Sequence, residues 1–305
     1  QFVRPSLGAW TLYGLGTESR NLPGFIVLNP SSGNGGAQNY GSAFLPAIYQ
    51  ATPISGSSGQ ISNIANRRMS RERQRMQLDL IQGLNQGRLK QKQVDPNLES
   101  VIDSLELAFK MQTEVPQLMN VYKESSSVRR AYGIGSRSTD SFGKQCLLAR
   151  RMAEAGVRFI ELNSGGWDHH RGLKSGMERN CRAIDKPIAA LLADLEKRDM
   201  LKDTLVMWGG EFGRTPHGES DDGRDHNNRG YTMWMAGGGV KGGMRYGQTD
   251  EYGFAAVDGR MHIHDWHATV LHLLGLDHKK LTFHYSGRDF RLTDVHGEVA
   301  KEILA

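Results

Sequence analysis

Three short glycine-containing segments in the second half of the chain carry side chains that often bind metal ions. They are NSGGWDHHRG, GGEFGRTP and GRDHNN, and their acids and imidazoles are Asp168, His169, His170, Glu211, Asp225 and His226. Carboxylate oxygen combined with imidazole nitrogen suits divalent cations such as zinc or manganese. The alternative for any one segment is a turn, because acids beside glycine are also turn formers. The presence of three such segments favours a metal site.

The elements that must position these segments follow from the apolar pattern. Strands are predicted at 157–162, 204–208 and 231–236, and helices at 142–156, 176–199 and 264–275. Helix and strand alternate with short connections, which is typical of an α/β fold with a parallel or mostly parallel sheet and helices on both faces. Ligands bind such sheets at the carboxyl ends of the strands. We therefore expect the three segments to meet at one sheet edge.

The predicted metal ligands are Asp168, His170, Glu211, Asp225, His226 and His267. Two divalent ions about 4 Å apart would clamp the oxygens of a sulfate or phosphate ester and need about six ligands of this kind. Zinc is favoured, with calcium or manganese as alternatives. His267 lies in the apolar helix DWHATVLHLLG, where a buried core histidine is the alternative.

Arg214 and Arg224 are the predicted substrate-binding residues, because a guanidinium forks onto an anionic ester. The alternative for each is a surface salt bridge. Thr215 is the nearby hydroxyl that could act as a nucleophile. Glu211 follows a strand that is expected to be buried, where an uncompensated carboxylate is costly. A shared metal ion or Arg214 would compensate it, and the ion is the expected partner.

Composition sets broader limits. The 305 residues carry a formal net charge of +5, with Lys and Arg scattered along the chain, which argues against nucleic acid as a partner. No apolar run approaches the roughly 18 residues of a membrane span. The two cysteines show no CxxC spacing, so neither a disulfide framework nor a thiolate metal site is expected. Residues 1–66 are predicted to be an irregular wrapping segment, 67–130 a helical segment with Ser70 as a cap, and 142–305 the core that carries the site.

The segments GGWDHH, DTLVMWGGEFGRTP, GRDHNNRGYTMWMAGGGVKGG and HDWHATVLHLLGLDHKKLTFHYSGRDF resemble bacterial sulfatase-like proteins of unassigned function in the alkaline phosphatase superfamily. By this resemblance Glu211 stands where the superfamily has a metal-binding Asp, and Phe212 replaces the adjacent His. Asp225 or His226 would then take the place of that missing His as a metal ligand. Asp168 and His170 match the mid-chain ligands, while His169 could instead point into the core.

The resemblance also implies what the intact protein does. It implies one sulfatase-like α/β domain over 1–305, as the C-terminal part of a longer protein whose first metal ligand and catalytic nucleophile lie outside this chain. It further implies a metal-dependent hydrolase of sulfate or phosphate esters, with an anionic ester substrate and a periplasmic or secreted location. The alternative is a non-catalytic metal-binding or structural member of the same fold.

Overall fold

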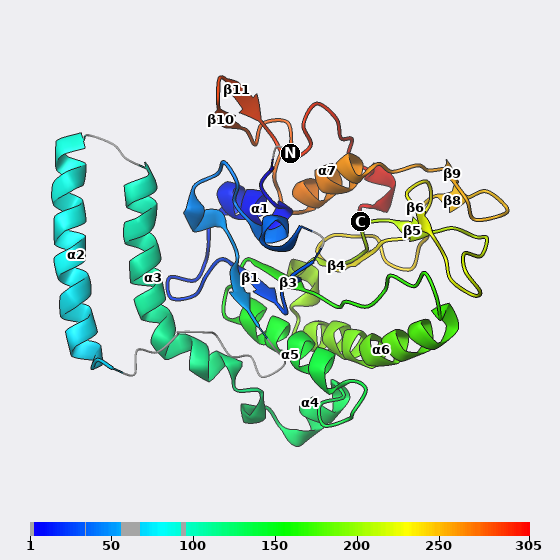
Figure 1. Cartoon of the computed structure of the whole chain (residues 1–305), viewed down its shortest axis with the longest axis horizontal. Helices are drawn as coiled ribbons and strands as arrows, with labels where there is room; N and C mark the ends of the chain where they lie inside the picture. Colours follow the sequence, from blue (N-terminus) through cyan, green and yellow to red (C-terminus); the bar gives the residue numbers. More distant parts are fainter. Residues whose placement is uncertain (1–2, 34, 56–67, 93–95) are drawn as a thin grey trace. The chain divides into compact units, whose positions relative to one another are not determined.

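The structure is a computed structural model that describes residues 3–33, 35–55, 68–92 and 96–305 (Figure 1). The chain divides into two compact units. The first contains Gln1–Ser126 and Leu147–Asn163, and the second contains Ser127–Cys146 and Ser164–Ala305. In the described part of the chain, no helix has an apolar stretch long enough to cross a membrane. The expectation of one domain made of three segments remains a prediction.

A three-stranded parallel sheet forms the centre of the first unit. Strand β1 (Phe25–Leu28) lies between β2 (Thr52–Ile54) and β3 (Phe159–Leu162). All four β1 residues are buried, which explains why FIVL is a continuous apolar run rather than an alternating one. Phe25 pairs in register with Phe159, and their rings meet edge to face with centroids 5.0 Å apart.

Helix α1 (Leu7–Leu15) packs closely against this sheet. Its N-cap, Ser6, accepts a hydrogen bond from the Ala9 amide at 3.3 Å. A Cβ added at Gly8 would lie 2.5 Å from the Phe25 ring, so only glycine permits this approach of helix to strand.

A helical hairpin completes the first unit, consisting of α2 (Arg71–Lys92) and α3 (Pro96–Met119). Ser70 accepts a hydrogen bond from the Arg73 amide at 3.4 Å, so the predicted cap of this helix is confirmed. Arg75 on α2 forks onto Glu106 on α3 through bonds of 2.7 and 2.9 Å. A bidentate pair of this kind joins the two helices at a defined register.

Helix α5 (Asp140–Glu154) places a buried guanidinium inside the first unit. Arg150 lies 2.8 Å from Glu124 and 2.6 Å from Glu154, and its side chain is almost completely inaccessible to solvent. Burial acts to raise the pKa of Glu124, but hydrogen bonds from Arg150 and Arg151 outweigh it, and the net pKa is lowered. Glu124 is therefore ionised and paired within this unit.

The second unit contains two long helices and four two-stranded antiparallel ladders. The helices are α6 (Leu173–Lys197) and α7 (Ile263–Leu273). The ladders are β4 (Val206–Trp208) with β7 (Trp234–Ala236), β5 (Gly213–Arg214) with β6 (His226–Asn227), β8 (Gln248–Thr249) with β9 (Ala256–Asp258), and β10 (Phe283–Tyr285) with β11 (Arg288–Phe290).

Several short helical turns connect these elements. They are α4 (Ser126–Ala131) and the 3-10 helices η1 (Gly36–Tyr40), η2 (Ala47–Tyr49), η3 (Val121–Lys123), η4 (Leu201–Asp203) and η5 (Lys301–Ile303).

The prediction of a large parallel sheet with helices on both faces is wrong. The expected helices at 142–156, 176–199 and 264–275 are present as α5, α6 and α7, with ends shifted by one to three residues. Among the described residues, however, the one parallel sheet has three strands, and β4 pairs with β7 in antiparallel fashion. A parallel pair needs a crossover connection, usually helical, but the segment from β4 to β7 contains only the β5–β6 ladder and loops.

Candidate metal centre

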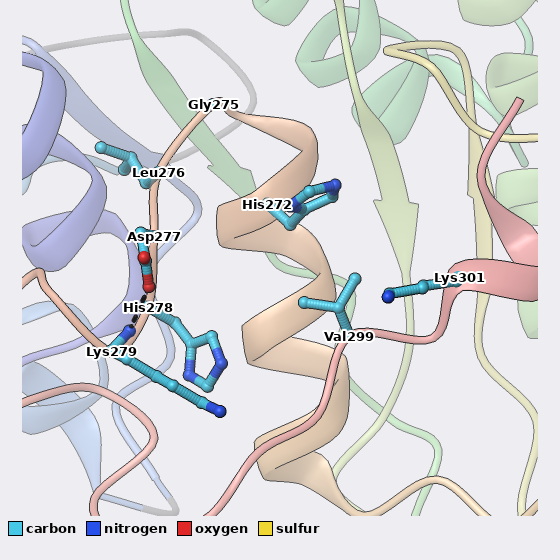
Figure 2. A pocket seen from close by; sticks show the side chains of 8 residues that line it. All are labelled: His272, Gly275, Leu276, Asp277, His278, Lys279, Val299 and Lys301. Atoms are coloured by element: carbon cyan, nitrogen blue, oxygen red, sulfur yellow. Dashed lines mark hydrogen bonds between the residues drawn. The ribbon is translucent and has the colours of Figure 1, made fainter.

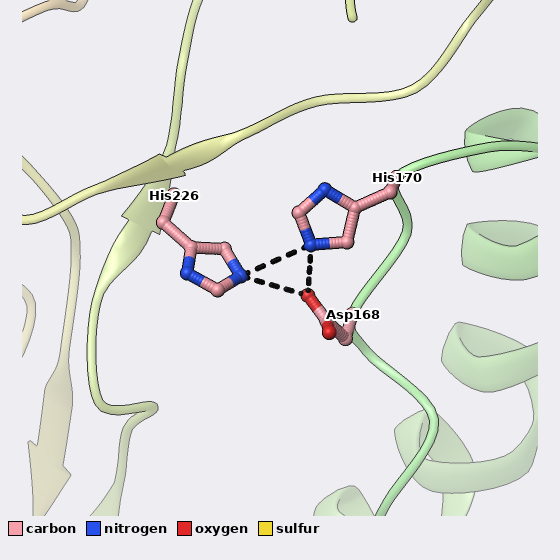
Figure 3. A group of neighbouring side chains, drawn as sticks. All are labelled: Asp168, His170 and His226. Atoms are coloured by element: carbon pink, nitrogen blue, oxygen red, sulfur yellow. Dashed lines mark hydrogen bonds and ion pairs between the residues drawn. The ribbon is translucent and has the colours of Figure 1, made fainter. Parts of the chain in front are cut away.

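Three donor atoms in the second unit lie close enough to share one metal ion. Asp168 Oδ1 lies 3.0 Å from Nε2 of His170 and 3.0 Å from Nε2 of His226. The two imidazole nitrogens are 3.1 Å apart, so the three atoms form a nearly equilateral triangle (Figure 3). The three side chains are between 40% and 63% exposed, which leaves the triangle open to solvent. We call these three residues the donor triangle.

The β5–β6 ladder positions one corner of the donor triangle. His226 stands opposite Arg214 in the antiparallel register, and its ring lies against Phe212 with centroids 4.1 Å apart. The backbone amide of His226 donates to Oδ1 of Asp225 at 2.7 Å. The imidazole is therefore held by its ring contact and by its strand, with Nε2 directed at Asp168 (Figure 3).

The loop between β5 and β6 is fastened to the segment that carries the other two corners. Asp222 accepts hydrogen bonds from the amides of Gly172 and Lys174, at 2.7 and 3.2 Å, at the start of α6. Gly223 lies directly against the His170 backbone, where a Cβ would overlap the carbonyl oxygen. The close approach of His170 to this loop thus depends on a glycine.

Arg214 supplies positive charge at the donor triangle. Its Nη2 donates to Asp168 Oδ1 at 2.7 Å. This hydrogen bond makes the largest contribution to lowering the pKa of Asp168 to about 2, and the hydrogen bond from His226 makes the next largest. The carboxylate is therefore ionised at neutral pH, which is the form that binds a cation.

Glu219 is a site residue that the sequence analysis missed. Its Oε2 lies 2.7 Å from Nδ1 of His170, the ring nitrogen that faces away from the donor triangle. This hydrogen bond raises the pKa of His170. Glu219 lies in the acidic segment GESDDGRD, and nothing in its spacing distinguishes it from Asp221 or Asp222. The signal that identifies it is the fold of the loop.

His170, Glu219 and Asp225 form a second group of potential ligands whose donor atoms lie within 4.8 Å of one another. His170 belongs to both groups. A carboxylate bonded to the outer nitrogen of a metal-binding histidine usually fixes the tautomer and orientation of the ring. Glu219 is suited to that task, because it leaves Nε2 of His170 available to an ion.

Glu211 and His267 lie in neither group of potential ligands found among the described residues. Glu211 is exposed, and its side chain has no hydrogen-bond or ion-pair partner within the described ranges. Strand β4 ends at Trp208, which is itself 38% exposed. The carboxylate of Glu211 therefore stays in solvent, and the desolvation cost that motivated an ionic partner does not arise.

The remaining predicted residues have structural contacts. The Arg224 guanidinium donates to its own loop, to the carbonyls of Asp222 at 3.2 Å and Gly223 at 2.8 Å. The Thr215 hydroxyl is largely buried, donates to the His217 carbonyl at 3.0 Å and accepts from the Asp225 amide at 3.1 Å. Both of its hydrogen-bonding roles are thus used within the loop.

His169 differs from its neighbour His170 in environment. Its ring is buried and lies against Gly176 of α6, where a Cβ would overlap the imidazole. The alternative that His169 points inward agrees with this position.

A separate pocket lies beside α7 (Figure 2). It is lined by His272, Gly275, Leu276, Asp277, His278, Lys279, Val299 and Lys301. None of the lining residues belongs to the donor triangle. His278 is fixed at this pocket by Thr293, whose hydroxyl lies 2.9 Å from its Nδ1.

Comparison with known proteins gives a family but no function. Residues 1–304 match the family described as "Protein of unknown function (DUF1501)". No curated protein matches, and no solved structure matches. Nothing in these comparisons indicates a sulfatase or the alkaline phosphatase superfamily, so that resemblance is corrected to this family. The periplasmic or secreted location stays a prediction.

Proposed function

The chain belongs to the DUF1501 family, whose function is unknown, and we propose that it is a metal-dependent hydrolase of sulfate or phosphate esters. The metal is a divalent ion, with zinc favoured, held by Asp168, His170 and His226. The proposal follows from the geometry of these three side chains.

The shape of the donor triangle is the observation that supports the proposal. A tetrahedral zinc ion with ligand distances of about 2.0–2.1 Å separates neighbouring donor atoms by about 3.3 Å. The three edges here measure 3.0, 3.0 and 3.1 Å. Expansion by a few tenths of an ångström would accommodate the ion, and zinc commonly takes two imidazole nitrogens with one carboxylate oxygen.

The solvent-exposed side of the triangle supports a catalytic rather than a purely structural ion. Catalytic zinc sites have three protein ligands and keep a fourth position open, whereas structural sites are closed. Zinc held by these residues would supply Lewis acidity and would make a water nucleophilic near neutral pH. The guanidinium of Arg214, whose Nη2 lies 2.7 Å from Asp168 Oδ1, places positive charge beside the donor triangle. That charge favours an anionic ester as the substrate.

A non-catalytic metal-binding role is the second candidate. It is favoured by the contacts of Arg224, one of the two predicted substrate-binding residues, and of the nearby Thr215 hydroxyl. The Arg224 guanidinium and the Thr215 hydroxyl are both engaged within their own loop. In this role the ion fastens the 163–172 segment to the β5–β6 ladder.

Metal analysis combined with two hydrolysis assays tests the proposal. The protein is loaded in turn with zinc, manganese and calcium, and the bound ion is counted after equilibrium dialysis. Hydrolysis of 4-nitrophenyl phosphate and 4-nitrophenyl sulfate is then measured. His226→Gln should lose the ion and any activity, while the matched control His217→Gln, an exposed histidine of the same segment, should keep both.

The outcomes separate the two candidates. Metal-dependent turnover of either ester that is lost in His226→Gln supports the hydrolase. A bound ion that is lost in His226→Gln, without turnover of either ester, supports the non-catalytic role. Equal metal content in His226→Gln and His217→Gln would exclude the donor triangle as the site.

A further inference from the structure

A second group of imidazoles gathers at the start of α7. It comprises His262, His264, His267 and His296. The rings of His262 and His264 have centroids 4.8 Å apart, and those of His264 and His296 are 5.4 Å apart. His264 and His267 are separated by three positions in α7, so both project from neighbouring positions on one helix face.

The C-terminal segment that carries His296 is fixed against α7 by several contacts. The Glu298 amide donates to Asp265 Oδ1 at 2.8 Å, and the Ala300 amide donates to the Thr269 hydroxyl at 3.0 Å. Gly297 packs so closely that a Cβ would lie 2.9 Å from the His264 carbonyl oxygen. The proximity of His296 to the helix is therefore built into the fold.

His267 carries the most unusual nitrogen of the group. Its Nδ1 is buried and has no hydrogen-bond partner among the described residues. Buried polar atoms are nearly always paired, so an unpaired one requires an explanation.

The rings of His264 and His296 are spaced as two imidazoles on one ion are, but the nitrogens of His264, His267 and His296 do not all lie within 4.8 Å of one another, so His296 would have to turn inward to complete the site. Two imidazoles bound to one tetrahedral ion at about 2.0–2.1 Å place their ring centroids about 5 Å apart. The rings of His264 and His296 are 5.4 Å apart, and the corresponding rings of the donor triangle, His170 and His226, are 4.9 Å apart. His296 is exposed, so its ring is free to turn toward an ion without disturbing the core.

His262 and Asp265 already form other hydrogen bonds in this region. Nδ1 of His262 accepts the His264 amide as the N-cap of α7, so its Nε2 carries the proton and does not bind metal while the cap is formed. The Asp265 carboxylate already accepts the amides of His262 and Glu298, each at 2.8 Å. The other imidazoles of the group are those of His264, His267 and His296.

We propose that His264, His267 and His296 form a second metal site, which takes a divalent ion that prefers imidazole, such as zinc, nickel or copper. The site is independent of the donor triangle and does not rest on the proposed function. An ion there would pair the buried Nδ1 of His267 and fasten the C-terminal segment to α7.

Counting zinc in a protein without the donor triangle tests this site. In the double variant Asp168→Asn, His226→Gln, equilibrium dialysis should still find one zinc ion per chain. Adding His264→Gln and His296→Gln should weaken the remaining binding by at least tenfold. Adding His272→Gln instead, an exposed histidine of the same helix, should leave it unchanged.

Two further measurements make the result decisive. Circular dichroism shows whether the variants fold. If the variant with both His264→Gln and His296→Gln does not fold, His296→Gln alone, a change at an exposed position, is used in its place. Cobalt substitution reports ligand-field absorption from a three-imidazole site. Zinc content that is the same with and without these histidines, in folded protein, would overturn the second site. If the donor triangle binds no ion, the wild-type protein should still bind one zinc ion at the second site. Failure of the donor triangle and failure of the second site therefore give different zinc counts.

Discussion

Glu219 Oε2 lies 2.7 Å from Nδ1 of His170, on the side of the imidazole opposite the donor triangle. The bond selects the tautomer with the proton on Nδ1, which leaves the Nε2 lone pair directed at Asp168 and His226. A carboxylate outside the donor triangle therefore decides which nitrogen of His170 faces Asp168 and His226.

Glu219→Gln should weaken zinc binding by about 10- to 100-fold, the usual cost of losing a carboxylate that orients a metal-binding histidine. The matched control is Glu211→Gln, an exposed carboxylate outside both ligand groups, and it should leave the affinity unchanged. Competition with a chromophoric chelator measures both. A loss in Glu211→Gln with none in Glu219→Gln would reverse the assignment.

Gly223→Ala should also weaken zinc binding, because the new Cβ would displace the His170 backbone. The expected loss is at least tenfold, since a first ligand moves with its backbone. Gly218→Ala is the control in the same loop, because its Cβ would lie 3.6 Å from the nearest atom, the Asp221 carbonyl oxygen. Unchanged affinity in folded Gly223→Ala would show that His170 does not need this close approach.

Arg150→Ala should destabilise the protein by about 1–3 kcal/mol, because it removes one of the two guanidinium partners of the largely buried Glu124 carboxylate and leaves Arg151 as the other. Glu154→Gln removes the more exposed partner of the same guanidinium, and it should cost about 0–1 kcal/mol. Urea unfolding followed by circular dichroism gives both values. Similar costs for the two variants would contradict the unequal burial of the two pairs.

His278 should make stability fall with acid. Its burial, followed by the charges of Arg291 and Lys279, lowers its pKa in the folded state. Above about pH 6.5 the imidazole is neutral in both states and contributes no pH dependence. As the pH falls below 6.5, the unfolded chain takes up a proton that folded His278 resists, so stability is lost.

The urea midpoint should therefore decrease more between pH 7 and pH 5 in the original protein than in His278→Gln. Glutamine keeps a polar partner for Thr293 but does not titrate. His217→Gln, at an exposed position and without an ion pair in the described part of the chain, is the control and should retain the original pH dependence. Equal slopes in all three proteins would show that His278 takes up its proton equally in both states.

The sequence predicted the helices better than the sheet. Apolar spacing and the Ser70 cap are local signals, and they indicated α2, α5, α6 and α7. The direction of β7 relative to β4 is set by how the segment between them returns, which residue types within the strands do not encode. The alternation of helix and strand along the sequence therefore predicts a parallel sheet that the chain does not form.

The donor triangle could be predicted only in part, because its residue types are local signals whereas its contacts are long-range. Glycine beside Asp168, His170 and His226 signalled chemistry, and the structure brings these three together. Which acid of the GESDDGRD segment reaches His170 depends on the Asp222 contact with α6 and on Gly223, both of which are long-range features. Glu211 looked buried because TLVMW is apolar, yet β4 is short and its end is exposed.

The central position of β1 has a consequence for synthesis. Its second partner, β3, lies about 130 residues further along the chain. At roughly 5–20 residues per second on a ribosome, FIVL waits on the order of ten seconds for that edge to be covered. An apolar, β-prone segment with an open edge is prone to aggregation during this interval. Nascent chains arrested before β3 should therefore recruit a holdase chaperone through residues 25–28, and chains arrested well after it should not.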